Sequence, residues 1–594
     1  MNTLEVLRNI PYFKNLSLEA FEELHQKADI INLQCGKSLL SQGDTGDDIY
    51  VLLDGRLRAI RESKGSKVIL GEISRGEIVG EMATLLGEKR NATIIAIRNS
   101  VLLKLKGADF TALLQQQQTS INQLIRTVVD RTKKTFVPKQ KIISVAVVPL
   151  ADNLNLEHFL PQLTQELQKY ASTKLVSDAS LQKTHPDIFK DENRVSSLLA
   201  KYEDEYDFLL YQTDSTWNDW TKHCVSRADK ILIVANSKQS PEIGEFEAEL
   251  LQTLQKTNQA SWELILLHDS KAQKPKDTRF WLEKRNIARH YHIVPNDLKD
   301  IQRLSRFLTG NTIGVALSGG GFRAVSQAGI LHAIMESGIP IDIIGGSSGG
   351  AFIGGGYACV DKPEDIPQII QKGDALFKDS KVLTFPIVSL FSGKHFTNGM
   401  KGFFKDFRIE DLWIDYFCIS LSLVSGKLII HEEGPLWKTV RASTSVMGIL
   451  PPVIENGECL VDGGLINSCP TNILVQKGAG KVIVINASTQ SGIKVDNEFP
   501  PTISGWSLLA RKLNPFNKKK IGPTILTNIT QSMYMASNHL QDRVYADSNI
   551  DLFIVPPISE ADSMTLDASV QLYEEGYQYG LSQVDNWKQQ LNLS

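Results

Sequence analysis

The chain has 594 residues, more than one hydrophobic core can hold, so we expect about two to four domains. Its 64 Lys and Arg residues almost balance its 67 Asp and Glu residues, and the net charge of −3 provides no overall field for a nucleic-acid partner. The six cysteines show no Cys-x-x-Cys spacing, which argues against a metal site and against a disulfide framework.

The hydrophobic segments favour a soluble protein. The first apolar stretch contains Glu5 and Arg8, so it does not have the pattern of a signal peptide. Residues 343–360 are uncharged, but seven of them are glycine, which predicts a buried strand and helix and not a membrane span. We therefore expect a cytoplasmic protein whose contact with membranes is peripheral.

Residues 1–135 have the pattern of a small β-barrel or jelly roll with flanking helices. A helical segment is predicted at residues 18–28 and another at residues 109–129. Between them, short runs of alternating apolar and polar residues, such as residues 51–59, are separated by turn glycines. Short, evenly spaced strands of this kind are typical of closed antiparallel sheets.

Within this region, residues 80–93 interrupt the strands with a glycine turn, one helical turn and an arginine, a combination that suits a phosphate group. The segment resembles the phosphate-binding cassette of cyclic-nucleotide-binding domains, and residues 43–50 resemble the strand–turn motif that precedes it. The resemblance implies a site at Gly80, Glu81 and Arg90. Glu81 would hold the ribose 2′-hydroxyl and Arg90 the cyclic phosphate of cAMP or cGMP, acting as an effector.

Residues 136–310 are predicted to form a central α/β domain, after a basic linker that contains one proline. Apolar strand patterns occur at residues 142–149, 208–212, 230–235 and 262–268. Helical patterns alternate with them, as at residues 156–170 and 243–254. This alternation predicts a mostly parallel sheet. No Gly-x-x-x-x-Gly-Lys-Ser/Thr sequence occurs, so the pattern argues against nucleotide hydrolysis and leaves a spacer or a regulatory lid as the expected role.

The last region, residues 311–594, begins with two strand–turn–helix units. Residues 313–317 form a buried strand pattern that leads into Gly319, Gly320 and Gly321, and a helical pattern follows. Three glycines between a strand and a helix free their backbone N–H groups to converge on an oxyanion.

The second unit places Ser348 in the sequence Gly-x-Ser-x-Gly of a nucleophile elbow, at residues 346–350. A serine at a sharp strand-to-helix turn has strained dihedrals, so its neighbours must lack bulk. A tight packing turn is the alternative interpretation. For the glycine turn at 319–321, the alternatives are a phosphate loop, which would need a Lys-Ser/Thr that does not follow, and a dinucleotide fold. A dinucleotide fold would need an acid at the end of the next strand, whereas Asp342 lies near the start of that strand. The tandem units favour acyl transfer.

A serine nucleophile needs a base, and Asp462 is the candidate. It ends an apolar strand pattern and precedes two glycines, although an aspartate–glycine turn also occurs without any catalytic role. Only His539 follows it in the chain, in a sequence that reads as the middle of a helix. A Ser–Asp–His triad is therefore disfavoured.

Together, the sequences Gly-Gly-Gly-Phe-Arg at 319–323, Gly-Ser-Ser-Gly-Gly at 346–350 and Asp-Gly-Gly at 462–464 resemble the patatin-like phospholipase family. With the preceding domains, the arrangement is similar to the neuropathy-target-esterase branch of that family. The resemblance implies an α/β patatin-like hydrolase domain with a Ser348–Asp462 dyad, an oxyanion site that includes Arg323, and hydrolysis of phospholipids or lysophospholipids without a catalytic cofactor. The alternative is a ligand-sensing scaffold with a degenerate hydrolase domain.

Residues 506–520 contain five basic residues and no acid, interleaved with Trp, Leu and Phe. This composition suits the interface of an anionic bilayer, where cations meet headgroups and apolar side chains enter the lipid. A solvated loop is the alternative, because Asn514, Pro515 and Asn517 break regular structure. We predict peripheral membrane contact through this segment.

Overall fold

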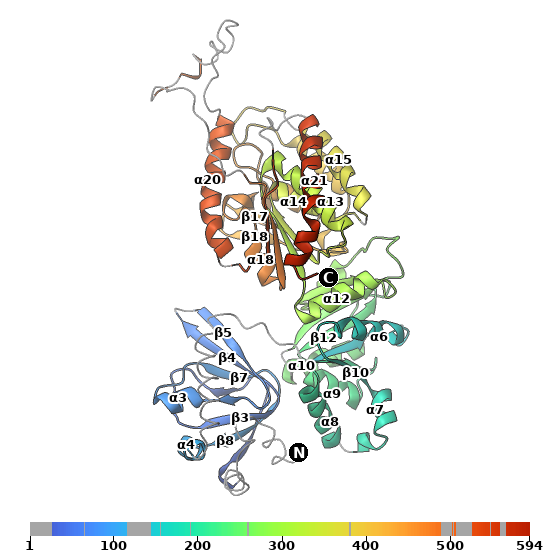
Figure 1. The fold of residues 1–594 in the computed structure, drawn as a ribbon, viewed down its shortest axis with the longest axis vertical. Coiled ribbons are helices and arrows are strands. Elements are labelled where there is room, and N and C mark those ends of the chain that lie inside the picture. Colours follow the sequence, from blue (N-terminus) through green and yellow to red (C-terminus); the bar gives the residue numbers. More distant parts are fainter. Residues whose placement is uncertain are drawn as a thin grey trace. The chain divides into compact units, whose positions relative to one another are not determined.

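The computed structural model describes residues 26–115, 144–488, 502, 504–506 and 525–593, except residues 64–65, 155, 191, 258–259, 361, 379–381, 547 and 559–565. The chain divides into two compact units. The first consists of Met1–Ser270 and Phe280–Ser305, and the second of Lys271–Arg279 and Arg306–Ser594. Figure 1 shows both as ribbons. The predicted helix at residues 18–28 lies mostly outside the described residues, as do the basic linker and residues 507–520.

The first unit contains a jelly roll of two four-stranded antiparallel sheets, with the orders β1-β8-β3-β6 and β2-β7-β4-β5. The strands are β1 (Asp29–Leu33), β2 (Ser38–Leu40), β3 (Ile49–Asp54), β4 (Leu57–Ser63), β5 (Ser66–Ile73), β6 (Ile78–Val79), β7 (Thr93–Ala96) and β8 (Ser100–Leu105). Two helices, α3 (Glu81–Leu86) and α4 (Gly107–Gln115), accompany them. The predicted N-terminal barrel fold is confirmed.

The same unit contains a six-stranded parallel sheet with the order β10-β11-β9-β12-β13-β14. Its strands are β9 (Ser144–Pro149), β10 (Thr173–Ser177), β11 (Phe208–Gln212), β12 (Lys230–Asn236), β13 (Ser261–Leu267) and β14 (Arg289–Ile293). Its helices are α6 (Leu156–Leu167), α7 (Asp178–Thr184), α8 (Glu192–Glu205), α9 (Asp219–Arg227), α10 (Glu245–Thr257), α11 (Arg279–Leu282) and α12 (Leu298–Thr309). All six residues of β9 are buried, as a strand covered on both faces requires.

A buried ionic cluster joins the jelly roll to this parallel sheet inside the first unit. Arg56 and Arg98 both donate to the carboxylate of Asp229, which is almost fully buried. Arg227 donates 3.0 Å to Asp54 and 3.1 Å to Glu203. Buried charges are stable only when they are paired in this way, so these contacts depend on one another.

The second unit is built on a sheet with the order β19-β20-β17-β16-β15-β21-β22, and β18 pairs with β17. The strands are β15 (Ile313–Leu317), β16 (Ile343–Ser347), β17 (Asp415–Ser422), β18 (Leu428–His431), β19 (Val453–Glu455), β20 (Glu458–Asp462), β21 (Lys481–Ile485) and β22 (Leu552–Ile554). The strands β22, β21, β15, β16 and β17 run parallel, and β20 runs antiparallel to β17. The carboxyl ends of β15 and β16 therefore lie side by side.

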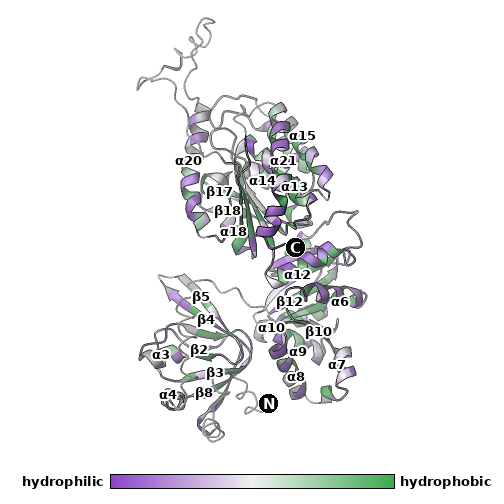
Figure 2. Ribbon diagram, viewed as in Figure 1, coloured by the Kyte–Doolittle hydropathy of each residue, from purple (hydrophilic) through white to green (hydrophobic). Residues whose placement is uncertain are grey.

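Helices cover both faces of this sheet. They are α13 (Val325–Glu336), α14 (Gly349–Ala358), α15 (Ile366–Lys378), α16 (Lys394–Phe404), α17 (Leu436–Ser443), α18 (Thr471–Gln476), α20 (Ile525–Ala546) and α21 (Leu566–Gln590). Figure 1 shows α20 on one side of the sheet and α13, α15 and α21 on the other. The central strands are mostly hydrophobic, whereas α20 and α21 carry hydrophilic residues along their length (Figure 2). Among the helices described, none combines the length and hydropathy that a membrane crossing requires.

Candidate active site

Ser348 stands between β16 and α14 with φ 54° and ψ −123°, a strained conformation for a residue with a side chain. Glycines on either side make the sharp turn sterically possible. A Cβ on Gly346 would lie 2.5 Å from the backbone of Gly350, and a Cβ on Gly350 would lie 2.5 Å from the carbonyl oxygen of Leu317. Only hydrogen fits at these positions, so the Gly-x-Ser-x-Gly spacing follows from the packing of α14 against β15 and β16.

Asp462 reaches Ser348 from the end of β20. Because Asp462 pairs with Ser420 on β17 and Ser347 pairs with Ile419, the acid and the elbow lie at the same level of the sheet. The side chain is 3% exposed. Burial raises the pKa of Asp462 to about 6, against the lowering effect of hydrogen bonds from Ser348 and from the backbone of Gly464. The Gly464 N–H donates to its Oδ1 over 2.8 Å.

The glycine-rich turn after β15 packs directly on the elbow. A Cβ on Gly319 would lie 3.4 Å from the Cβ of Ser348, and a Cβ on Gly349 would lie 2.7 Å from the carbonyl oxygen of Gly321. The Gly319 N–H donates to Ser468 O over 2.8 Å. For the N–H groups of Gly320 and Gly321, no hydrogen bond is present within the described parts of the chain. These two groups belong to the turn that packs on the elbow, and they are the candidate donors to a negatively charged oxygen.

Arg323 has a different position from the two glycine N–H groups. Its Nε donates to the carbonyl oxygen of Ala487, which follows β21, over 3.2 Å. A Cβ on Gly320 would lie 2.9 Å from that same oxygen. Arg323 thus fixes the glycine-rich turn to the end of β21, and its direct contact with an oxyanion stays a prediction.

Two serines near the end of α17 fix the backbone of the candidate dyad, and sequence reasoning did not single them out. The Ser443 Oγ accepts a hydrogen bond from the Ser348 N–H at 3.1 Å. The Ser445 carbonyl accepts one from the Asp462 N–H at 2.9 Å. Arg441 holds Ser445 in place, because its Nη1 donates to the Ser445 Oγ over 2.5 Å. The same guanidinium is anchored by Thr397 Oγ1, which accepts from Nε over 3.1 Å, and by the carbonyl of Pro451, which accepts from Nη2 over 3.0 Å. In the sequence, the only feature that could have identified these serines is the run of small polar residues at 443–445.

The histidines do not complete a triad. His539 lies within α20, as the sequence predicted, and its side chain is exposed. His431 is hydrogen-bonded to the Oγ of Ser420 at 2.7 Å, and burial lowers its pKa to about 4. The neutral, buried imidazole of His431 therefore links β18 to β17 through Ser420 rather than orienting the nucleophile. Among the described residues, no group of three His, Cys, Asp or Glu side chains is arranged to hold a metal ion.

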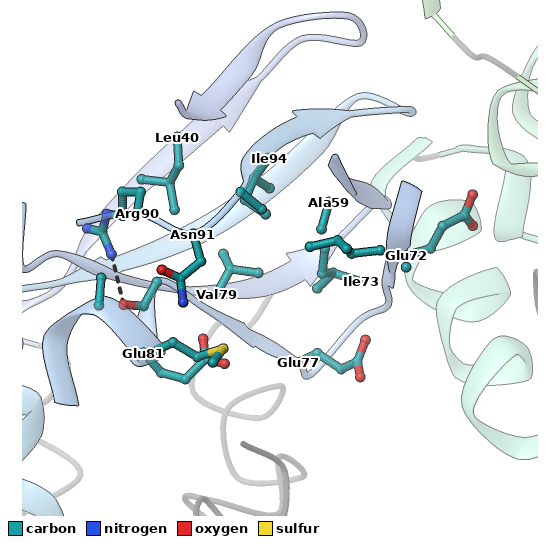
Figure 3. Close-up of a pocket in the computed structure, with 16 residues that line it drawn as sticks. Leu40, Ala59, Glu72, Ile73, Glu77, Val79, Glu81, Arg90, Asn91 and Ile94 are labelled. Atoms are coloured by element: carbon teal, nitrogen blue, oxygen red, sulfur yellow. Dashed lines mark hydrogen bonds between the residues drawn. The ribbon is translucent and has the colours of Figure 1, made fainter. Parts of the chain in front are cut away.

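A cavity of about 400 Å³ opens in the jelly roll, and Gly80, Glu81 and Arg90 all line it. Figure 3 shows Arg90 and Asn91 across from Glu81 at one end, with Glu72 and Glu77 toward the other. Apolar side chains that include Val79, Ile73 and Ile94 lie between these ends.

Arg90 is held at the rim of this cavity by the backbone. Its Nη1 donates to Gly80 O over 2.8 Å, the bond drawn in Figure 3, and its Nη2 donates to Asp48 O over 2.7 Å. Gly80 has φ 90° and is the N-cap residue of α3. A Cβ there would lie 2.7 Å from the guanidinium, so the glycine is required for Arg90 to reach its place. The residues that the sequence predicted as a nucleotide site are brought together.

Three known families match successive parts of the chain. Residues 30–117 match "Cyclic nucleotide-binding domain", residues 141–310 match "Neuropathy Target Esterase family P-loop like domain", and residues 315–475 match "Patatin-like phospholipase". In these matches and in their order along the chain, the protein is similar to the neuropathy-target-esterase branch of the patatin-like phospholipases. The patatin-like match contains the glycine-rich turn, Ser348 and Asp462, and the cyclic-nucleotide-binding match contains the cavity residues.

Curated relatives align over almost the whole chain. Patatin-like phospholipase domain-containing protein 7 of Rattus norvegicus is 31% identical over 617 residues, covering 94% of this chain and 45% of that protein. Neuropathy target esterase sws of Drosophila melanogaster is 31% identical, with 93% and 42% covered. Patatin-like phospholipase domain-containing protein 6 of Homo sapiens is 30% identical, with 93% and 44% covered. This neuropathy-target-esterase-like chain therefore spans less than half the length of these relatives.

Proposed function

We propose that this chain is a carboxylic-ester hydrolase that removes acyl chains from phospholipids or lysophospholipids through Ser348 and Asp462. The observation that carries the proposal is the strained Ser348 hydrogen-bonded to a buried carboxylate and packed on a glycine-rich turn. The alternative, a scaffold with a degenerate hydrolase domain, requires that one of these parts be missing. The patatin-like match contains the glycine-rich turn, Ser348 and Asp462, so that alternative is not favoured.

In the first half-reaction, Ser348 Oγ attacks the ester carbonyl carbon while Asp462 takes the hydroxyl proton. The N–H groups of Gly320 and Gly321 donate to the oxyanion that forms. When the tetrahedral intermediate collapses, the acyl–oxygen bond to the glycerol breaks, and the leaving alkoxide receives the proton from Asp462. Loss of a single oxyanion donor typically lowers the rate by a factor of about 10² to 10³.

In the second half-reaction, water replaces the alcohol. Asp462 takes a proton from the water as its oxygen attacks the acyl-enzyme carbonyl. The same N–H groups donate to the oxyanion that forms. When this second tetrahedral intermediate collapses, the proton returns from Asp462 to Ser348 Oγ and a fatty acid is released. Because burial raises the pKa of Asp462 to about 6, the carboxylate is a stronger base than an exposed aspartate.

The test is turnover of the purified full chain on p-nitrophenyl butyrate and on lysophosphatidylcholine micelles. We expect Ser348→Ala to abolish both activities without a loss of folded protein by circular dichroism. His539→Ala is the matched control, because this side chain lies exposed on α20 outside the dyad. Undiminished turnover by Ser348→Ala, or a collapse of turnover in His539→Ala, would contradict the dyad.

We also propose that the jelly-roll cavity binds a cyclic nucleotide, cAMP or cGMP, as an effector. Its volume of about 400 Å³, the cation Arg90 at its rim and the carboxylate Glu81 within it support a ligand that combines an anionic phosphate with ribose hydroxyls. Calorimetry on the full chain with each nucleotide tests this. An absence of heat and of any thermal shift with saturating cAMP and cGMP would leave the domain a structural element only.

The expected location is cytoplasmic and peripheral to a membrane, with residues 506–520 as one proposed contact. Trp506 is described and is 81% exposed, and the following residues lie outside the described part of the chain. Cations beside an exposed aromatic residue favour anionic lipid. Vesicle sedimentation at low and high salt, with Lys518, Lys519 and Lys520 changed to glutamine, tests this contact. Equal sedimentation of the wild type and the triple variant would refute it.

A further inference from the structure

An apolar loop projects from the patatin-like unit between α15 and α16. All seven residues from 382 to 388 are exposed, and five of them are large and apolar. Phe385 and Ile387 are 83% and 82% exposed, and Val382, Leu383 and Val388 are between 44% and 74% exposed. Residues 382–393 contain no charged side chain at all. Single exposed apolar residues are common on protein surfaces, whereas a contiguous exposed run of them marks an interaction surface.

The apolar loop has a defined backbone. Leu383 and Phe391 form an antiparallel bridge, and the Thr384 N–H donates to Leu390 O over 3.1 Å. At the tip, the Ile387 N–H donates to Phe385 O over 2.8 Å, and Pro386 between them has no N–H to satisfy. These two internal bonds, and a proline that has no N–H, lower the cost of placing this part of the loop in an apolar medium.

The base of the apolar loop is attached to the segment that borders the dyad. The Leu390 N–H donates to Gly448 O over 2.9 Å, and the Phe391 N–H donates to Ile449 O over 3.0 Å. The same segment begins at Ser443, which accepts from the Ser348 N–H. The base of the apolar loop is therefore hydrogen-bonded to the segment that leads from Ser443 to Ile449.

A second exposed apolar group lies on the same edge of the sheet. The turn after β17 carries Leu423 and Val424, which are 52% and 65% exposed, and Ile454 on β19 is 66% exposed. Strand pairing places these residues just beyond the level of Asp462, since Ser422 pairs with Leu460 and Leu460 with Val453. The carboxyl edge that presents Ser348 is therefore flanked by apolar side chains on two separate segments.

We propose that the apolar loop, residues 382–388, docks this chain on the surface of a lipid bilayer by inserting Phe385 and Ile387 among the acyl chains. This inference rests on the proposed lipid substrate, which would enter the site from the bilayer. The uncharged tip with its large, exposed apolar side chains suits hydrocarbon, whereas a protein interface would need polar groups at its rim. Insertion depends on apolar contact, so it requires no anionic lipid and resists salt, unlike the contact expected for residues 506–520.

The experiment compares the full chain with the double variant Phe385→Ser/Ile387→Ser. Both side chains are exposed, so the change leaves the fold intact. Val475→Ser is the matched control, because Val475 is also an exposed apolar residue, at 42% exposure, but lies at the opposite edge of the sheet. Its position follows from Gly478, three residues later, whose carbonyl accepts a hydrogen bond from Thr312 Oγ1 at that edge. Flotation with phosphatidylcholine vesicles, in a Ser348→Ala background, measures binding without hydrolysis. Turnover of p-nitrophenyl butyrate by the same changes in the active protein measures the chemistry.

We expect the double variant to lose vesicle binding by about tenfold or more in 0.15 M and in 1 M salt, and to keep its turnover of the soluble ester. Val475→Ser should change neither. Equal flotation of parent and double variant, or no flotation of the parent, would overturn the proposal. A matching loss of soluble-ester turnover would instead make the loop part of the substrate pocket. If the parent hydrolyses no ester but its flotation still depends on the loop, the proposed function fails and the docking surface stands.

Discussion

Changing Asp462 to asparagine should make the protein inactive and more stable at the same time. Burial raises the pKa of this carboxyl from 3.8 to about 6. The folded chain therefore holds the proton more tightly than the unfolded chain, and the free energy of unfolding falls as the pH rises from about 4 to about 6. A shift of roughly two pKa units corresponds to about 3 kcal/mol. Asparagine carries no charge and keeps the Oδ1 that accepts from the Gly464 N–H.

Thermal unfolding from pH 4 to pH 8 measures this effect. We expect similar midpoints for the wild type and Asp462→Asn near pH 4, and a midpoint about 5 °C higher for the variant at pH 8. Turnover should fall by about 10²- to 10⁴-fold, as for the loss of a general base. Ser348→Ala is the control, because it also stops turnover but retains the buried carboxylate and its pH dependence. A difference in midpoint that is the same at pH 4 and pH 8 would refute the reasoning.

Four further outcomes are expected. Because Asp462 must be ionised to act as a base, kcat/KM should rise with pH through about 6 and then level off; a rate independent of pH between 5 and 8 would contradict this. Gly349→Ala should lower kcat about a hundredfold, because its Cβ would lie 2.7 Å from the glycine-rich turn, whereas Gly402→Ala has open space and should have no effect. Glu81→Gln should weaken cyclic-nucleotide binding in calorimetry and leave basal ester hydrolysis unchanged. Asp229→Asn should lower the free energy of unfolding in urea by about 3–5 kcal/mol, because it removes the carboxylate that two buried arginines share; an unchanged midpoint would contradict this.

The sequence predicted the strands whose residues are apolar on both faces. The ranges of β11 and β15 coincide with those predicted, because each is a short apolar run bounded by turns or charges. The strand β17 was missed, although it lies inside its sheet, between β20 and β16. Its apolar residues are interrupted by Cys418, Ser420 and Ser422, which are buried polar or thiol groups. Hydrophobic periodicity cannot distinguish a buried serine that has a hydrogen-bond partner from an exposed one.

The sequence predicted those parts of the candidate site where close backbone packing allows only one residue type. Gly346 and Gly350 mark the elbow, because at each of them a Cβ would clash with neighbouring backbone. Ser443 and Ser445 act through one hydroxyl and one carbonyl, on a segment far from Ser348 in the sequence, so no local pattern identifies them. The exposed apolar loop was also missed, because an apolar run in a sequence predicts burial unless the tertiary structure shows otherwise.

The burial of Asp462 accounts for how the proposed dyad would work without histidine. An exposed aspartate has a pKa near 3.8 and is a poor base toward a serine hydroxyl, whereas imidazole has an ordinary pKa near 6.5. Desolvation brings the carboxylate to about 6, close to the basicity of imidazole, while the group remains mostly ionised at pH 7. His431 is moved in the opposite direction, to about 4, by the same burial. A low-dielectric site disfavours the charged form of both groups, and this strengthens an acid as a base while it weakens an imidazole. In a site as enclosed as this one, the carboxylate is therefore the better proton acceptor.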